Sequence, residues 1–110
     1  MTHIKKDKVA IVIISHSPDV ASGAAEMVKQ MSGQSVPVKA VGGDFEGGLG
    51  TNVEAIHRAY EEVYCDEGVL VIYDLGSAEM SAETAREFLD QEKQEKIIIS
   101  HAPLVEGACL

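Results

Sequence analysis

The sequence predicts an α/β fold, a doubly wound sandwich around a four-stranded parallel sheet. Three observations lead to this prediction. Short runs rich in β-branched residues have the composition of strands that are buried on both faces. Each run is followed by a stretch in which apolar residues recur at helical spacing. The length of 110 residues suits one domain, whose core is large enough to fold without disulfides or metals.

The first strand and the first helix follow one another almost without a loop. Residues 9–14, VAIVII, form a continuous apolar run that ends just before a serine and His16. Ser17 then supplies a helix cap, and Pro18 fits the first helical position. The helix is expected to stop at Gly33. Its apolar face is predicted to consist of Val20, Ala24, Met27, Val28 and Met31.

The second strand is expected at residues 35–41. Pro37 favours a place near the edge of the sheet, because proline cannot donate to a central ladder. A glycine-rich loop, GGDFEGGLG, covers residues 42–50. Thr51 and Glu54 then fit a capping box, which predicts that the second helix begins there.

The second half of the chain repeats the alternation of strand and helix. The third strand, VLVIY at residues 69–73, ends at Asp74. The third helix is indicated by the apolar residues Ala82, Ala85, Phe88 and Leu89. KIIIS at residues 96–100 predicts the fourth strand, and residues 102–110 have the composition of the first turns of a helix. Strands that alternate with helices in this way require right-handed crossovers.

Composition disfavours several classes of function. Eighteen Asp and Glu residues against nine Lys and Arg give a formal charge of −9, which repels phosphate backbones. Nucleic-acid binding is therefore not expected, and the acidity either attracts a basic protein partner or only keeps the chain soluble. No apolar run is long enough for a membrane span or a signal peptide, so we expect a soluble, cytoplasmic protein with no membrane contact.

The cysteines and histidines indicate neither a disulfide framework nor a metal site. Cys65 and Cys109 are the two cysteines, and they form no CxxC pair. The four histidines are widely spaced, without an HxH or HExxH motif. We therefore predict a fold that depends on its apolar core and carries no metal.

The candidate chemistry lies at the carboxyl ends of the strands, where open parallel sheets bind ligands. With the flavodoxin-like strand order 2-1-3-4, His16 lies between the glycine loop and Asp74. His101 follows a similar phrase, IIISHAP against VIISHSP, but stands at the end of an outer strand. A nucleophilic imidazole needs one nitrogen fixed by a hydrogen bond, which the Asp74 carboxylate can accept. We therefore predict His16 and Asp74 as the catalytic pair.

The surroundings of His16 favour a bound phosphoryl group. Backbone N–H groups of the glycine loop and the positive end of the helix that starts at Ser17 both stabilise negative charge. The loop is no Walker motif, and GLGTNV lacks the third glycine of a dinucleotide fingerprint, so stable nucleotide binding is disfavoured. The residues predicted to bind phosphate are Ser17, Gly43, Gly48, Gly50, Thr51 and Ser77.

Four motifs resemble one known family. They are VIISHS at 12–17, GG at 42–43 followed by GGLGT up to Thr51, VLVIYDLGSAEMSAE at 69–83 and APLVEGA at 102–108. Together they resemble the phosphotransferase subunit of the phosphoenolpyruvate-dependent dihydroxyacetone kinase, whose leading domain is a mannose-class enzyme IIA domain. The resemblance covers essentially the whole chain, so residues 1–110 are expected to be one such phosphotransferase domain.

The resemblance implies a specific function. The family is a cytoplasmic homodimer with a flavodoxin-like sheet, in which His16 accepts a phosphoryl group from the phosphocarrier protein HPr. The group passes to ADP on the nucleotide-binding subunit of the kinase, and Asp74 is the partner of His16. The metal ion belongs with the nucleotide on that subunit, so the resemblance implies no cofactor on this chain. It gives no functional role to His101.

Two alternative functions stay open. An enzyme IIA domain of a mannose-class sugar transporter shares the histidine chemistry. The other alternative is a non-catalytic regulatory module on the same fold, because a histidine at a strand end is often structural.

Family domains continue past VEGA through a longer C-terminal helix, whereas this chain stops at Leu110. A domain that lacks this helix is therefore a further expectation.

Overall fold

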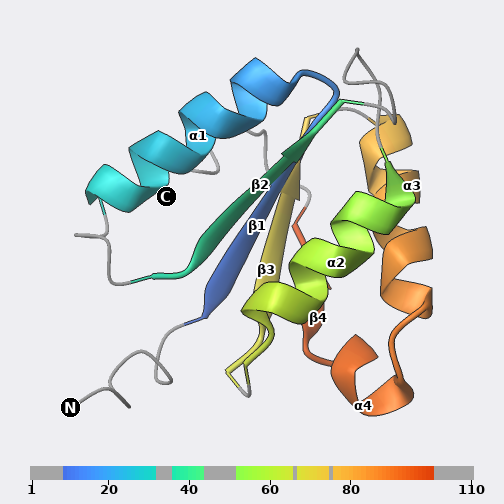
Figure 1. Cartoon of the computed structure of the whole chain (residues 1–110). Coiled ribbons are helices and arrows are strands. Elements are labelled where there is room, and N and C mark those ends of the chain that lie inside the picture. Colours follow the sequence, from blue (N-terminus) through green and yellow to red (C-terminus); the bar gives the residue numbers. More distant parts are fainter. Residues whose placement is uncertain (1–8, 32–35, 44–51, 66, 75, 101–110) are drawn as a thin grey trace, which may run out of the picture.

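The centre of the protein is a four-stranded, all-parallel sheet (Figure 1). The computed structural model describes residues 9–31, 36–43, 52–65, 67–74 and 76–100. Its strands are β1 (Ala10–Ser15), β2 (Val38–Gly42), β3 (Val69–Tyr73) and β4 (Ile97–Ile99). The strand order β2-β1-β3-β4 confirms the predicted fold class, and β2 lies at an edge, as Pro37 indicates.

Helices cover both faces of the sheet, as a doubly wound fold requires (Figure 1). They are α1 (Pro18–Met31), α2 (Val53–Val63), α3 (Gly76–Glu87) and the short α4 (Gln91–Gln94). The α1 helix covers one face, and α2 and α3 lie side by side on the other. The carboxyl ends of the strands and the amino ends of α1, α2 and α3 therefore gather at the same side of the domain.

The β1 strand runs through the middle of the core and is buried from both sides. Val12 and Ile14 belong to the larger apolar cluster beneath α2 and α3, whereas Ile13 belongs to the smaller cluster beneath α1. All three side chains are fully buried. Because successive side chains of a strand point to opposite faces, a strand covered on both faces is apolar without alternation.

The α1 helix begins as predicted but turns a different face to the sheet. Ser17 Oγ accepts a hydrogen bond from the Val20 backbone N–H at 3.3 Å, which confirms the cap. The buried residues are mainly small: Ala21, Ala24, Ala25 and Val28. The prediction that Val20, Met27 and Met31 face the core is wrong, since all three are exposed. Alanines let the helix approach the sheet closely, and the larger side chains point outwards.

The α2 and α3 helices both begin at residues other than those expected. Asn52, not Thr51, caps α2, and its Oδ1 accepts a hydrogen bond from the Ala55 N–H at 3.2 Å, so the predicted capping box is wrong. The α3 helix begins at Gly76, well before the apolar residues that indicated it. Phe88 follows the end of α3 and is exposed instead of buried. The helix expected over residues 102–110 lies outside the described residues.

A close contact holds the end of β2 against the turn that enters α1. A Cβ atom placed on Gly42 would lie 2.6 Å from Pro18 Cα and 2.7 Å from the Ser17 carbonyl oxygen. Both are backbone atoms, which cannot swing aside like the end of a side chain. Glycine is therefore required at Gly42, and the contact fixes the position of the turn that directly follows His16.

Replacing Gly42 by alanine is expected to lower the free energy of unfolding by about 1–3 kcal/mol, because the backbone of the His16 turn must shift. Gly23 on α1 provides a matched control, since a Cβ atom there meets nothing within 4 Å. Gly23→Ala should raise the free energy of unfolding by about 0.4–1 kcal/mol. Urea unfolding followed by circular dichroism measures both. A Gly42→Ala protein as stable as the wild type would contradict the close contact.

Candidate functional site

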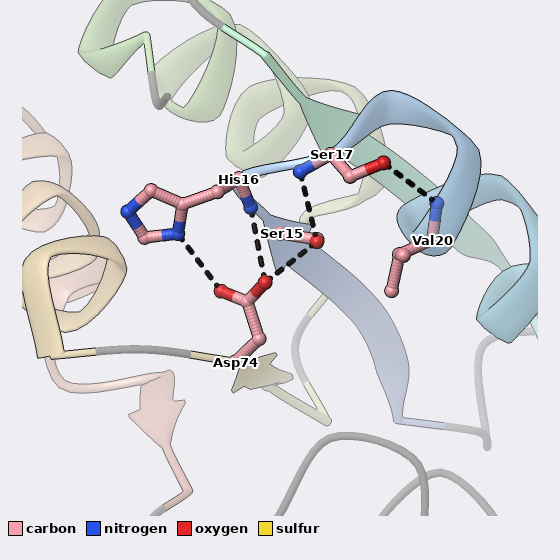
Figure 2. A network of polar contacts seen from close by, with 5 residues as sticks. All are labelled: Ser15, His16, Ser17, Val20 and Asp74. Atoms are coloured by element: carbon pink, nitrogen blue, oxygen red, sulfur yellow. Dashed lines mark hydrogen bonds and ion pairs between the residues drawn. The ribbon is translucent and has the colours of Figure 1, made fainter. Parts of the chain in front are cut away.

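His16 and Asp74 meet at the carboxyl edge of the sheet (Figure 2). His16 follows β1 and Asp74 follows β3, and these strands pair in parallel with Ile14 opposite Tyr73. Because the pairing of β1 with β3 is in register up to their ends, the residues that follow these two strands lie next to each other. The His16 Nδ1 atom lies 3.1 Å from Asp74 Oδ1.

The Asp74 carboxylate is held by three hydrogen bonds. Besides the contact of Oδ1 with the His16 ring, Oδ2 accepts from the Ser15 hydroxyl at 2.7 Å and from the His16 backbone N–H at 3.1 Å. The Asp74 and His16 side chains are each 22% exposed. The hydrogen bonds therefore fix the carboxylate, while both side chains stay partly accessible to solvent.

The pKa of Asp74 is lower than the ordinary value of 3.8. Burial raises this pKa, but the hydrogen bonds from the Ser15 hydroxyl and from the His16 ring and backbone, together with the His16 charge, outweigh burial. Asp74 is therefore ionised at neutral pH and can only accept hydrogen bonds.

An ionised Asp74 determines the tautomer of the neutral His16 ring. A hydrogen bond between Nδ1 and a carboxylate requires the proton on Nδ1. The lone pair of the neutral ring is then on Nε2, the nitrogen on the other side of the ring from Asp74. The carboxylate also lies where it would stabilise a positive charge on the ring.

Ser15 belongs to this network, although it was not predicted as a site residue. Its side chain is fully buried at the end of β1. Its Oγ donates to Asp74 and accepts from the Ser17 backbone N–H at 3.1 Å. The sequence gives no signal for this role, because the burial of the hydroxyl and its two partners appear only in the structure.

The predicted phosphate-binding residues are only partly within the described residues. Ser17 lies next to His16, where its hydroxyl caps α1 (Figure 2). Gly43 directly follows β2 and has a φ of 85°, a conformation that favours glycine. Ser77 is in the first turn of α3, which begins two residues after Asp74, but its side chain is not described. Gly48, Gly50 and Thr51 lie outside the described residues, as does His101.

His57 has surroundings typical of a structural histidine. It lies on α2, where Nε2 is 3.7 Å from Glu61 Oε2 one helical turn away. Its ring meets the Phe88 ring edge-on, with 6.1 Å between the centroids. His57 therefore offers a histidine of similar accessibility that lies outside the His16 network.

Neither a metal centre nor a membrane helix is found in the part of the chain that the structure describes. Within the described ranges, no group of three or more His, Cys, Asp or Glu residues could hold a metal ion. No helix within them is long and apolar enough to cross a membrane.

Comparison with known proteins identifies the family of this chain. The family model EIIA-man, described as the PTS system fructose IIA component, matches residues 10–110. The chain belongs to the EIIA-man family. This membership confirms the mannose-class enzyme IIA resemblance of its motifs.

The relatives described here are all DhaM subunits of dihydroxyacetone kinases. The phosphoryl donor subunit DhaM of PEP-dependent dihydroxyacetone kinase 2 from Listeria innocua is 43% identical over 100 residues, which cover 91% of this chain and 80% of that protein. The phosphotransferase subunit DhaM of the PTS-dependent kinase from Lactococcus lactis is 37% identical over 98 residues, 89% of this chain and 75% of that protein. The Escherichia coli DhaM is 39% identical over 102 residues, 90% of this chain but 22% of that longer protein.

A solved structure supports the fold independently. The crystal structure described as unknown function protein EF1359 superposes with a TM-score of 0.82 at 36% sequence identity. The match covers 92% of this chain and 78% of that one.

The low pKa of Asp74 makes stability depend on pH in a defined direction. Because the pKa is lower in the folded protein, the carboxylate stabilises the fold above its unfolded pKa, and this contribution is lost as pH falls from about 4 through the folded-state pKa. An NMR titration of the Asp74 carboxyl carbon should give a midpoint below 3.8. In the Asp74→Asn protein, unfolding should depend less steeply on pH in that range. A midpoint at or above 3.8 would disprove the charge-stabilising network.

Proposed function

We propose that this chain is the phosphoryl carrier of a phosphoenolpyruvate-dependent dihydroxyacetone kinase. It accepts a phosphoryl group from HPr on His16 and passes it to ADP on the nucleotide-binding kinase subunit. The observation that carries the proposal is the His16–Asp74 pair, 3.1 Å apart at the strand ends of an EIIA-man domain. The names of its DhaM relatives support dihydroxyacetone kinase as the system in which the chain works.

In the proposed reaction, His16 is the nucleophile of the first transfer and the leaving group of the second. The Nε2 lone pair attacks the phosphorus atom as the bond to the donor histidine breaks, and the proton on Nδ1 stays in its hydrogen bond to Asp74. The ring then carries a positive charge, which the carboxylate stabilises. In the second step an oxygen of the ADP β-phosphate attacks the same phosphorus atom, the Nε2–P bond breaks and the lone pair returns to Nε2.

The transferred group needs stabilisation of its equatorial oxygens more than it needs further covalent chemistry. We assign this role to the amino end of α1 at Ser17 and to backbone N–H groups of the loop after β2. The full set consists of Ser17, Gly43, Gly48, Gly50, Thr51 and Ser77. The metal ion of the kinase reaction belongs, in this proposal, with the nucleotide on the partner, and this chain carries no cofactor.

The proposed unit is one phosphotransferase domain over residues 1–110 that works in the cytoplasm as a homodimer. The outer face of α1 supports contact with a second copy. Val20, Met27 and Met31 recur at spacings of seven and four residues, which places them on one helical face. They expose 44%, 38% and 64% of their surfaces. Burying such an apolar face against a second copy would be favourable.

An enzyme IIA domain of a sugar transporter is the second candidate. The description of the matching family as a fructose component of the phosphotransferase system favours it. Both candidates require the same phosphohistidine, so they differ only in the protein that receives the phosphoryl group.

His16→Ala should abolish phosphorylation, since the nucleophilic nitrogen is lost. Intact mass is measured after incubation with phosphoenolpyruvate, enzyme I and HPr, and the wild type should gain about 80 Da for one phosphoryl group. His57→Ala is the matched control and should keep the acid-labile adduct. A wild type that gains no mass, or an adduct that survives in His16→Ala, would refute the proposed carrier.

The two candidate acceptors are separated by a transfer assay. The phosphorylated protein is mixed with the nucleotide-binding subunit of a dihydroxyacetone kinase and ADP, or with a sugar-specific IIB protein. We expect ATP to form in the first mixture and no loss of phosphohistidine in the second. Transfer to the IIB protein alone would establish the sugar-transporter function instead.

A further inference from the structure

Ser15 has a role that the fold alone does not require. We infer that its buried hydroxyl is a positioning group for phosphoryl transfer, holding the Asp74 carboxylate in the orientation that keeps the proton on His16 Nδ1. The inference rests on the proposed function, because it concerns the reactivity of His16. It adds a residue that touches neither the phosphoryl group nor the reacting nitrogen.

The direction of the Ser15 hydrogen bonds follows from the number of protons available. A serine hydroxyl has one proton to donate. The Ser17 N–H, 3.1 Å away, can only donate, so it occupies a lone pair of Ser15 Oγ. The proton of the hydroxyl therefore goes to Asp74 Oδ2 at 2.7 Å, a length typical of a hydroxyl that donates to a carboxylate. With both bonds made, the hydroxyl has a single orientation.

Ser15 controls how Asp74 presents its second oxygen to the histidine. The hydroxyl and the His16 backbone N–H both bind Oδ2, which leaves Oδ1 directed at Nδ1. Without the hydroxyl, one backbone N–H would remain on Oδ2, and the carboxylate could rotate about its Cβ–Cγ bond. Rotation would weaken the Oδ1 contact that selects the Nδ1-protonated tautomer.

The position of Ser15 also explains why water cannot replace its hydroxyl easily. Ser15 is fully buried, while the His16 and Asp74 side chains are partly exposed to solvent. A water molecule in the small space left by an alanine would need to bond both Asp74 and the Ser17 N–H. The hydroxyl thus makes both bonds without the entropic cost of immobilising a water molecule.

The test compares Ser15→Ala with variants that distinguish a loss of Asp74 orientation from a loss of folding. Ser15→Cys fills nearly the same space with a weak donor, and Ser15→Thr keeps the hydroxyl. Thr84→Ala is the control, because it deletes an exposed hydroxyl that donates to the Met80 carbonyl oxygen within α3. Circular dichroism confirms that each variant is folded.

Two readouts are measured on each protein. The ¹⁵N chemical shifts of the neutral His16 ring report the tautomer, and rapid-quench experiments with phosphorylated HPr report the rate of phosphoryl acceptance. Ser15→Ala and Ser15→Cys should lose the preference for a proton on Nδ1, and their rates should fall roughly tenfold, as is typical when a group that orients a reactive residue is removed. Ser15→Thr and Thr84→Ala should keep the tautomer and rate of the wild type.

The outcomes distinguish this inference from the proposed function. Folded Ser15→Ala and Ser15→Cys proteins with the wild-type tautomer and rate would overturn the role of Ser15, while the phosphohistidine would stand. A wild type that is never phosphorylated would refute the carrier function. In that case the ¹⁵N shifts still decide whether Ser15 positions the pair. If Ser15→Ala does not fold, Ser15→Cys carries the same test.

Discussion

The parallel register of β1 against β3 is the constraint on which the site depends. Ile14 lies opposite Tyr73, so the chain after each strand emerges at the same point of the sheet edge. A shift by one residue would turn the side chains of β1 to the wrong faces and move His16 away from Asp74. Close packing on both faces holds this register, since Val12, Ile13 and Ile14 are fully buried. The apolar core thus places two polar groups that contribute nothing to it.

The fold could be predicted from the sequence because its main signals are local. The run at residues 9–14 is apolar on both faces, and the alternation of strands and helices leaves few possible topologies. The details that were wrong depend on contacts that spacing does not specify. Asn52 and Thr51 are both good helix caps, and only the direction of the chain decides between them. Val20 and Met27 have the right spacing for a core face, but alanines pack against the sheet instead.

For the candidate site, the meeting of His16 and Asp74 could be predicted but the means of holding them could not. The strand order alone brings the two residues to neighbouring strand ends. Ser15 has no signature in the sequence, because one serine after an apolar run also fits an ordinary strand end. Its role appears only when β3 places a carboxylate 2.7 Å from its hydroxyl. A half-buried charge needs several donors, and in this protein two of the three come from one residue, His16.

The contact of Gly42 with the Ser17–Pro18 backbone joins two parts of the fold that lie far apart in the sequence. It ties the end of the edge strand β2 to the turn after His16, so the strand end and the turn must move together. Any side chain at residue 42 would therefore displace the backbone next to the histidine.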